Sequence, residues 1–514
     1  MSVSITYSLE RNAAHYGDRT AVLCDGRVTT WAQMARRCRA LAGGFNALGL
    51  TGGDRIGFLG LNSEWFFECY FAPALAGMEL VALNYRLTAA ELIACASDSA
   101  LRLLVVDPPH LQTGRAIAAA CPGLRLIVLG AAPGAGEIGY EALIAAAHAP
   151  TTAPGRDDDS AIIYYSGGTT GAPKGVMLSH WNICTNSAGS VAQYGFVPHE
   201  THLMVGPMFH AAAGSRVYTC AHLPAPVVLQ PKFDVAGFLG LIQTHRVAST
   251  QFVPTMMQMI LDHPEFARYD LSSLRQMTWG ASATSAELLR RIVAAFPHVD
   301  LVHGYGMTEA APLISGLGPD YHRADFATRG KLGSVGFPAS HCDLRIFDDA
   351  DTELPRGAVG EIVVRGPNVM KGYLNQPELT AETLRGGWLH TGDAGYLDAD
   401  GALWISGRIK DMIISGGENI YPAEIENVLS LHPDVAEVAV IGIPDPHWGE
   451  AVHAIVIPTP GSRATETELI TYTRAHLASY KCPRSLEFRS EPMPLSGANK
   501  VLKTELRKPY WNTT

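Results

Sequence analysis

Short apolar runs alternate with Ala/Leu-rich stretches through the first third of this chain of 514 residues. Residues 103–106, 125–129 and 161–165 are rich in aliphatic and β-branched side chains, whereas 90–96 and 114–120 are rich in alanine. Such alternation predicts parallel strands joined by crossover helices. We therefore expect an α/β fold, with ligands bound at the carboxyl ends of the strands.

The polar, acidic stretch 151–160 interrupts this pattern. We interpret it as a linker between two α/β subdomains. Past residue 330 the alternating segments 343–347 and 360–364, separated by Gly-Pro turns, predict antiparallel strands of a small β-barrel-like subdomain.

From residue 411 onward the pattern becomes α+β. A helix is expected near 422–431, a strand at 435–441 and a second helix near 466–477. This arrangement predicts a separate small C-terminal domain.

Composition excludes several classes of protein. The net charge of -10 is unlike that of a nucleic-acid-binding protein, which carries a basic patch or stripe. The nine cysteines form no Cys-x-x-Cys pair, so we expect reduced, buried side chains and neither a disulfide framework nor a zinc site. No stretch of 18 uninterrupted apolar residues and no secretory signal is visible, so the expected location is the cytoplasm. The oligomeric state stays open, a homodimer included.

The run Tyr165-Ser-Gly-Gly-Thr-Thr-Gly-Ala-Pro-Lys-Gly175 combines glycines, hydroxyls and one lysine. Glycines let the backbone approach phosphate oxygens, while exposed N–H groups, hydroxyls and a cation attract the anion. The run is not a Walker A loop, because Pro173 precedes Lys174 and Gly175 follows it. Taken alone, a run of this composition is more often a flexible turn than a phosphate site.

Further short motifs follow this loop in order. They are Pro207-Met-Phe-His210, Tyr305-Gly-Met-Thr-Glu309, Thr391-Gly-Asp393, Gly407-Arg-Ile-Lys-Asp411 running into Ser415-Gly-Gly-Glu-Asn-Ile-Tyr-Pro422, and Ser496-Gly-Ala-Asn-Lys500. Together they closely resemble the adenylate-forming superfamily of acyl- and aryl-CoA synthetases, luciferases and peptide-synthetase adenylation domains. The resemblance covers nearly the whole chain. It departs from the family at Gly167, where a serine is usual, and at Asn499, where a glycine is more common.

The resemblance implies an ATP-dependent acid:CoA ligase. A carboxylate first attacks the α-phosphate of ATP to give an acyl adenylate and pyrophosphate, and the thiol of coenzyme A then displaces AMP. Positioned cations and backbone donors stabilise the charge that develops in the first step. The implied substrates are a carboxylic acid, ATP and coenzyme A, with Mg²⁺ as cofactor.

Most of the implied site residues border the nucleotide. Tyr305 would stack on adenine, Thr308 would touch the α-phosphate, and Asp393 would accept the ribose hydroxyls. Glu309 and Thr170 would hold magnesium. The other nucleotide-binding residues implied are Ser166, Gly167, Gly168, Thr169, Gly171, Lys174, Gly280, Ala281, Ser282, Gly304, Gly306, Met307 and Arg408.

The resemblance also implies a large N-terminal domain over residues 1–409 and a mobile C-terminal domain over 410–514, hinged at Lys410. Lys500 is the implied catalytic residue of adenylation, as a mobile charge that bridges the carboxylate and the α-phosphate. Rotation would withdraw it and bring Ser415, Gly416 and Gly417 to the site, where they line the thiol channel. Solvated charged turns are the alternative for Arg408 and Lys410. Lys481 either supports this arrangement or is a plain surface lysine.

The acid is expected to bind among mostly apolar residues. The predicted pocket comprises Ala211, Gly214, Phe252, Trp279 and Ala310. A bulky indole at Trp279 would shorten the pocket and favour a medium-chain fatty acid or an aromatic, phenylpropenoic acid; a core tryptophan is the alternative. His210 lies beside the pocket in the family and is a candidate catalytic residue, but a satisfied core histidine also fits its sequence context.

Two other functions stay open at this stage. One is a stand-alone adenylation enzyme that loads an acyl carrier protein, or a luciferase-like oxygenase. The other is a non-catalytic nucleotide-binding homologue, which the intact Glu309, Asp393 and Lys500 disfavour.

Overall fold

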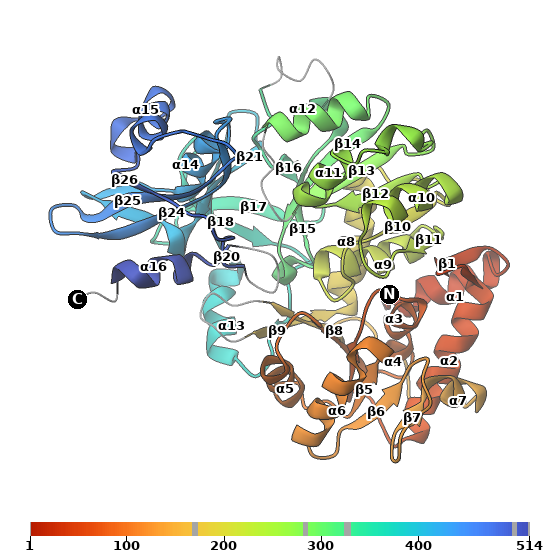
Figure 1. Cartoon of the computed structure of the whole chain (residues 1–514). Coiled ribbons are helices and arrows are strands. Elements are labelled where there is room, and N and C mark those ends of the chain that lie inside the picture. The colour runs from red at the N-terminus through yellow and green to blue at the C-terminus, as the bar shows by residue number, and fades with distance from the viewer. Residues whose placement is uncertain (1, 167–172, 281–285, 323–329, 496–500, 512–514) are drawn as a thin grey trace.

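The computed structural model describes residues 2–166, 173–280, 286–322, 330–495 and 501–511. Two large mixed sheets with helices around them form the N-terminal part, and two smaller sheets follow (Figure 1). The expected α/β architecture with a smaller C-terminal α+β unit is confirmed.

The first large sheet has eight strands. Its strands, in spatial order, are β19 (Gly372–Tyr373), β9 (Lys174–Ser179), β8 (Ser160–Ser166), β4 (Glu79–Leu83), β3 (Arg55–Leu59), β5 (Leu103–Val106), β6 (Arg125–Val128) and β7 (Ile138–Gly139). The strands from β8 to β7 are parallel, and β9 and β19 are antiparallel additions at one edge. Helices α5 (Ala89–Asp98) and α6 (Leu111–Ala120) cross between the parallel strands, as the sequence predicts.

The second large sheet has nine strands and takes in the N-terminal hairpin. Its strands, in spatial order, are β16 (Phe337–Pro338), β15 (Leu313–Leu317), β14 (Asp300–Gly306), β13 (Gln276–Gly280), β12 (Ser249–Phe252), β10 (His202–Met204), β11 (Val227–Leu229), β1 (Thr20–Cys24) and β2 (Arg27–Thr30). Its helices are α10 (Val235–His245), α11 (Pro254–Leu261) and α12 (Ala286–Ala295).

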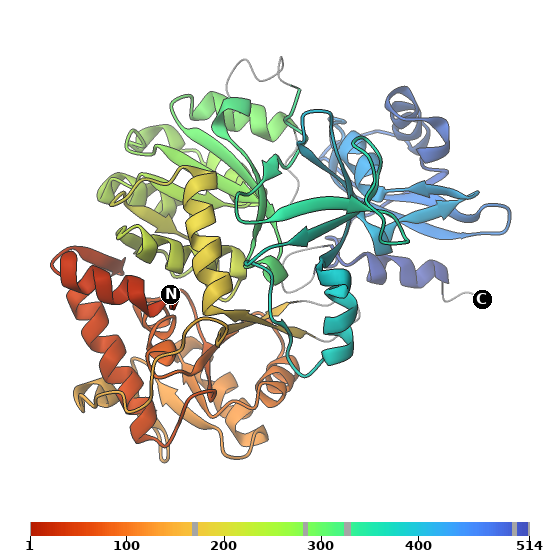
Figure 2. The same cartoon turned by 180° about the vertical axis from the view of Figure 1, so that it is seen from behind.

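One hydrophobic core joins the two large sheets. Ile56 and Ile162 of the first sheet and Val22 and Val227 of the second belong to the same buried cluster. The helices packed around this core are α1 (Thr6–His15), α2 (Trp31–Ala47), α3 (Glu64–Cys69), α4 (Ala72–Leu75), α7 (Tyr140–Ala145), α8 (His180–Tyr194) and α9 (Ala211–His222). Helix α8 stands between the sheets and contacts both β9 and β15 (Figure 2).

Local sequence sets the ends of α8. Ser179 Oγ accepts a hydrogen bond from the backbone N–H of Asn182, and the side chain of Asn182 returns the bond, which forms a capping box. The helix ends at Gly195, whose φ of 66° is left-handed and suits a residue without a Cβ.

The prediction of a linker between subdomains at residues 151–160 is wrong. Strand β8 begins at Ser160 and pairs with β4, so the chain on both sides of this stretch belongs to one sheet. The expected β-barrel-like unit is a four-stranded antiparallel sheet of β17 (Asp343–Phe347), β18 (Gly360–Arg365), β20 (Leu389–Leu397) and β21 (Leu403–Arg408). Helix α13 (Pro377–Thr383) lies between β19 and β20 in the sequence.

The C-terminal unit is a five-stranded sheet with helices on both faces. Its strands are β22 (Ile413–Ser415), β23 (Glu418–Ile420), β24 (Val435–Asp445), β25 (Gly449–Pro458) and β26 (Ser485–Phe488), and its helices are α14 (Pro422–Leu429), α15 (Glu466–His476) and α16 (Lys503–Trp511). Along β24, Val440 packs with α14 and α15, whereas its neighbours Ala439 and Ile441 pack with α16. Successive side chains of a strand point to opposite faces, so the sheet separates these helices.

The nine cysteines are all free in the structure. No helix among the described residues has the length and apolar character needed to cross a bilayer.

Candidate active site

Several predicted site residues lie outside the described residues: Gly167, Gly168, Thr169, Thr170, Gly171, Ala281, Ser282 and Lys500. The flanks of the glycine-rich loop are described. Ser166 ends β8 and pairs with Lys174, which begins β9. The loop therefore starts at the carboxyl end of a strand of the first sheet, the edge at which α/β sheets bind ligands.

Tyr305, Asp393 and Arg408 meet although they come from three strands, β14, β20 and β21. Tyr305 donates its hydroxyl proton to Asp393 Oδ2 at 2.7 Å, and Arg408 Nε lies 2.8 Å from Asp393 Oδ1. Asp393 faces Arg408 across the β20–β21 ladder, so backbone pairing fixes this ion pair. Burial and the neighbouring Asp393 raise the pKa of Tyr305 well above its usual value, which keeps the phenol a neutral donor.

Glu309 is held by a residue that the sequence alone does not single out. Tyr373 donates its hydroxyl proton to Glu309 Oε1 at 2.9 Å, and Lys174 Nζ lies 5.4 Å from the centre of the Tyr373 ring. Burial and Glu309 raise the pKa of Tyr373. Tyr373 thereby links the base of the glycine-rich loop to Glu309. A lone tyrosine on a two-residue strand carries no sequence signal that separates it from the other tyrosines of the chain.

The glycines of β13 and β14 allow close backbone packing. A Cβ at Gly280 would lie 2.3 Å from the carbonyl oxygen of Gly304, and a Cβ at Gly306 would lie 1.8 Å from that of Pro312. A Cβ at Gly304 would lie 2.3 Å from the hydroxyl of Tyr194. Thr308 and Met307 follow directly, half-buried, at the start of the 3-10 helix Thr308–Ala310.

A cavity of about 80 Å³ lies between α8, α9 and the strands β12 to β14. Aromatic rings line part of it, namely Tyr194, Phe196, Trp279 and Tyr305. The rest is more polar than the sequence predicts, with Ser190, Ser215, Arg216, Thr219, Gln251 and Thr278 on the wall.

Trp279 lies on the cavity wall and is also buried in the core, with 3% of its surface exposed. Its indole stacks on Phe252 at 5.9 Å and on His303 at 5.1 Å between ring centres. Phe252 therefore lies behind Trp279. A Cβ on Gly214 would meet the hydroxyls of Tyr70 and Tyr164, and Ala310 packs in the cluster that contains Tyr305.

Arg216 is the charged residue on the cavity wall, and it is not predicted from the sequence. Its signal is a single charge within the helix Ala211–His222, whose other residues are mostly small or apolar. His210 precedes this helix; its carbonyl accepts a hydrogen bond from Gly214 N–H at 2.7 Å, and its ring lies 5.9 Å from that of Phe209. Ala211 is buried on the first turn.

The predicted hinge and thiol-channel residues surround the first strand of the C-terminal unit. Lys410 lies in the 3-10 helix Ile409–Asp411 between β21 and β22. Ser415 pairs with Glu418, and Gly416 and Gly417 form the turn between them with left-handed φ of 61° and 85°. Lys481 pairs with Glu424 of α14 at 2.7 Å, within the same unit.

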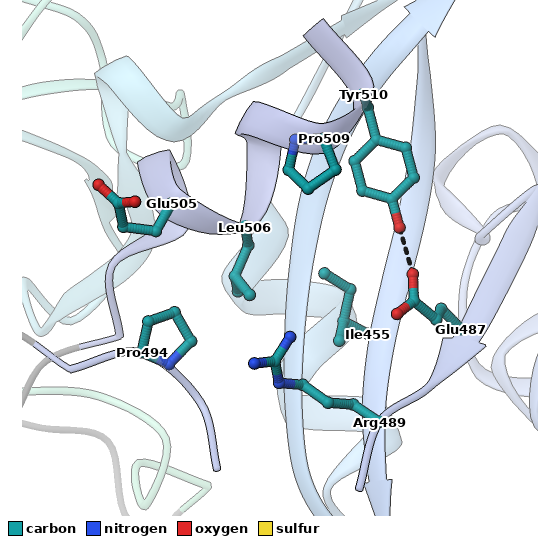
Figure 3. Close-up of a pocket in the computed structure, with 8 residues that line it drawn as sticks. All are labelled: Ile455, Glu487, Arg489, Pro494, Glu505, Leu506, Pro509 and Tyr510. Carbon is teal, nitrogen blue, oxygen red and sulfur yellow. Dashed lines mark hydrogen bonds between the residues drawn. The ribbon is translucent and has the colours of Figure 1, made fainter. Parts of the chain in front are cut away.

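A second cavity, of about 270 Å³, lies in the C-terminal unit between α16 and the strands β25 and β26. Figure 3 shows Tyr510 of α16 pointing toward Glu487, to which its hydroxyl donates a hydrogen bond. Pro494 and Leu506 line the same cavity from either side of the segment 496–500 in the sequence.

The two ends of the segment that contains Lys500 are held together. Leu495 and Val501 pair in an isolated antiparallel bridge, and Leu502 N–H donates to the carbonyl of Pro494 at 2.8 Å. Helix α16 then approaches the predicted hinge, where Arg507 Nη2 donates to the carbonyl of Asp411 at 3.2 Å.

Comparison with known proteins identifies the family. Residues 9–374 match the AMP-binding enzyme family, and residues 424–500 match the AMP-binding enzyme C-terminal domain. The chain is 42% identical over 492 residues to a feruloyl-CoA synthase from Amycolatopsis sp, with 96% of each chain covered. It is 36% identical to an indoleacetate--CoA ligase from Aromatoleum aromaticum, with 97% of each chain covered.

A solved structure gives the same result. The o-succinylbenzoate CoA synthetase of Bacillus subtilis, in complex with its acyl-adenylate intermediate, superposes with a TM-score of 0.85 at 29% identity over 98% of each chain. The same protein has been solved with ATP and magnesium ion, with a TM-score of 0.84 at 29% identity over 97% of this chain and 98% of that chain. The chain thus belongs to the AMP-binding enzyme family and is an ATP-dependent acid:CoA ligase that acts through an acyl adenylate.

Proposed function

We propose that this ligase activates an aromatic carboxylic acid of the arylpropenoic or arylacetic kind. The observation that carries the proposal is the cavity wall, where the rings of Tyr194, Phe196, Trp279 and Tyr305 surround a compact space. Aromatic walls favour a flat ring, which stacks against them, over a flexible chain that loses more conformational freedom. The names of the feruloyl-CoA synthase and the indoleacetate--CoA ligase, both similar to this chain, support an aromatic acid.

The nucleotide is proposed to bind where β14, β20 and β21 meet. Asp393 would accept the ribose hydroxyls, because an ionised carboxylate offers about four acceptor sites. Tyr305 and Arg408 both contact this carboxylate and hold it in place. The ring of Tyr305 would stack on adenine while its hydroxyl holds Asp393 in position.

Chemistry would occur at the α-phosphate. A carboxylate oxygen of the acid attacks the α-phosphorus, the bond to the bridging oxygen breaks, and pyrophosphate leaves. Ser166 and Lys174, with the loop between them, would hold the leaving group, and Thr308 and Lys500 would stabilise the reacting oxygens. The thiolate of coenzyme A then attacks the acyl carbon and AMP departs.

Glu309 is the described residue proposed to hold magnesium. Tyr373 occupies Oε1 of this buried carboxylate, which leaves Oε2 as a hard oxygen ligand of the kind that Mg²⁺ prefers. Thr170, outside the described residues, would add a second oxygen. When bound, the ion neutralises charge on the phosphates.

The two half-reactions are proposed to use one site in turn. Rotation about Lys410 would exchange the segment that contains Lys500 for the turn of Ser415 to Gly417. Gly417 supports this, because nothing lies within 4 Å of the place where its Cβ would be, which leaves room for a narrow thiol arm. The domain boundary would then lie between residues 409 and 410. Because ATP and coenzyme A are consumed, we place the reaction in the cytoplasm.

A direct assay tests the proposal. Purified enzyme with ATP, magnesium and coenzyme A is offered ferulate, cinnamate, indoleacetate, octanoate and dodecanoate, and CoA esters are measured by mass spectrometry. We expect at least one aromatic acid to exceed both fatty acids in kcat/KM by about tenfold or more, a difference of about 1.4 kcal/mol. Preference for octanoate or dodecanoate would contradict the aromatic assignment. Adenylate formation without any CoA ester would favour a carrier protein as acceptor.

A further inference from the structure

Arg216 is a buried cation on the wall of the substrate cavity. Its residue exposure is 5%, its Nη2 donates to Thr278 Oγ1 at 3.0 Å, and its guanidinium carbon lies 4.6 Å from the centre of the Phe196 ring. Within the described part of the chain, its Nη1 is buried and has no hydrogen-bond partner. One of the three nitrogens of the guanidinium therefore has N–H donors that are not used.

The charge of Arg216 is not balanced by a neighbouring carboxylate in the described residues. The electrostatic neighbours that act on it are Tyr194 and Cys220, and burial lowers its pKa. A guanidinium stays protonated in proteins, so the site holds a positive charge. A buried charge without a partner is costly, and an unused donor adds to the cost. Stability alone gives no reason to keep this residue.

Arg216 lies away from the strand ends at which the adenylate is proposed to form. Its partner Thr278 precedes Gly280, the last residue of β13, by two positions, and a strand advances about 3.3 Å per residue. Arg216 itself follows Ala211, the first residue of α9, by five positions, which is about 7.5 Å along the helix. An acid with its carboxylate at the strand ends would thus present its opposite end to Arg216.

We propose that Arg216 determines substrate specificity by binding an oxygen at the far end of the aromatic acid. The inference rests on the proposed function and adds the distal group that the substrate carries: a phenolic or carboxylate oxygen on the ring. Such an oxygen would accept the free Nη1–H and balance the buried charge. Ser190, Thr219 and Gln251 line the same cavity and supply further polar contacts.

A matched series of acids tests this role. The substrates are cinnamate, 4-methylcinnamate, 4-hydroxycinnamate and 4-carboxycinnamate, which share one skeleton and differ at the position opposite the side chain. We expect the wild type to prefer the better of the two oxygen-bearing acids over 4-methylcinnamate by about 10- to 100-fold in kcat/KM. Faster use of 4-hydroxycinnamate would identify the distal group of the substrate as a phenol, and faster use of 4-carboxycinnamate would identify it as a second carboxylate.

The substitution Arg216→Met removes the charge and keeps the length of the side chain. We expect the preference to fall below about threefold, chiefly through faster use of 4-methylcinnamate and slower use of the oxygen-bearing acid. Arg275→Met is the matched control, because Arg275 pairs with Glu200 at 2.7 Å and is not on the cavity wall. This control should keep the wild-type preference.

Ligand-induced thermal shifts provide a second readout that does not depend on turnover. Removing an unpaired buried charge should raise or maintain the Tm of unliganded Arg216→Met, while the stabilisation by the preferred oxygen-bearing acid should be lost. If Arg216→Met does not fold, Arg216→Lys is the variant to test. We expect its preference for the oxygen-bearing acid over 4-methylcinnamate to be reduced but not abolished, because lysine keeps the charge and lacks the planar guanidinium.

The outcomes separate two failures. Turnover of cinnamates with no preference for an oxygen, or with the same preference in Arg216→Met, would overturn the role of Arg216 and leave the aromatic assignment intact. Absence of every cinnamoyl-CoA product, with fatty acyl-CoA formed, would overturn the proposed function and the distal group with it.

Discussion

Lys174 stands at the base of the glycine-rich loop with its Nζ over the ring of Tyr373. If it holds the leaving pyrophosphate, Lys174→Ala should slow adenylation by about 100-fold, because a positioned cation acts only where negative charge develops. Thioester formation from a preformed adenylate should change by less than about threefold, because pyrophosphate is absent from that step. Single-turnover measurements of both half-reactions check this.

Lys371→Ala is the control for this experiment. Lys371 lies two residues before Tyr373, and its Nζ donates to the carbonyl of Asp158, so its loss removes a lysine that contacts a different part of the chain from the loop. Equal loss of both half-reactions in Lys174→Ala would argue against a role in holding the leaving group.

His303 and His322 flank Trp279 and give stability a dependence on pH. Burial lowers the pKa of each to about 4, below the ordinary value of 6.5. As the pH falls, the two histidines are protonated in the unfolded chain before they are protonated in the folded protein. The stability that is present above pH 6.5 is therefore lost as the pH falls toward 4. Between pH 7 and pH 5 the loss is about 1 to 2 kcal/mol per histidine.

Urea denaturation of wild type and His303→Gln at both pH values measures this contribution. The glutamine variant should lose less stability than the wild type on going from pH 7 to pH 5. An identical loss in the two proteins would show that His303 does not remain neutral in the fold.

Strand β14 carries Tyr305 and packs closely against its neighbours through Gly304 and Gly306. Gly306→Ala would place a Cβ 1.8 Å from the carbonyl oxygen of Pro312, so the β14–β15 hairpin must shift. We expect Tm to fall by several degrees and ATP binding to weaken, because Tyr305 and Thr308 flank the shifted residue. Gly318→Ala is the matched control in the same region, with nothing within 4 Å of the added Cβ. It should leave both quantities near the wild-type values.

Elements with strong local patterns are predictable from this sequence. The strands Leu103–Val106 and Asp343–Phe347 match the expected bounds because an uninterrupted apolar run or a strict alternation marks them. Sheet membership is not predictable in this way. β1 pairs with β11, about two hundred residues further along, and hydrogen bonding of the backbone leaves no trace in side-chain pattern. The error at residues 151–160 has this origin.

The same limit applies to the site. Asp393, Tyr305 and Glu309 can be predicted as site residues from the sequence because each lies in a short motif that resembles the adenylate-forming family. Tyr373 cannot be predicted in this way, because it is marked only by its contact with Glu309, which lies sixty-four positions away in the sequence. The ion pair of Arg408 with Asp393 likewise requires the register of β20 and β21.

At the scale of the whole molecule, Lys410→Pro tests the proposed hinge. Proline fixes φ near −65°, which suits the 3-10 helix Ile409–Asp411 and would lock the arrangement described here. We expect one half-reaction to fall by about tenfold or more relative to the other, because each requires its own orientation of the C-terminal unit. Pyrophosphate exchange and thioester formation from synthetic adenylate measure the two.

Lys410→Ala is the control, since it removes the side chain and leaves the backbone free to rotate. Its two half-reactions should change by similar factors. Equal effects in Lys410→Pro would place the pivot elsewhere in the chain.

Two contacts together determine how the C-terminal unit would move. They are the bridge between Leu495 and Val501 and the hydrogen bond from Arg507 to Asp411. They tie the lysine-bearing segment, through α16, to the residue that directly follows the proposed pivot. In the proposed rotation about Lys410, the C-terminal unit would therefore carry Leu495 and Val501 with it as one body. A small backbone rotation at the pivot would then move Leu495 and Val501 without any rearrangement inside the C-terminal unit.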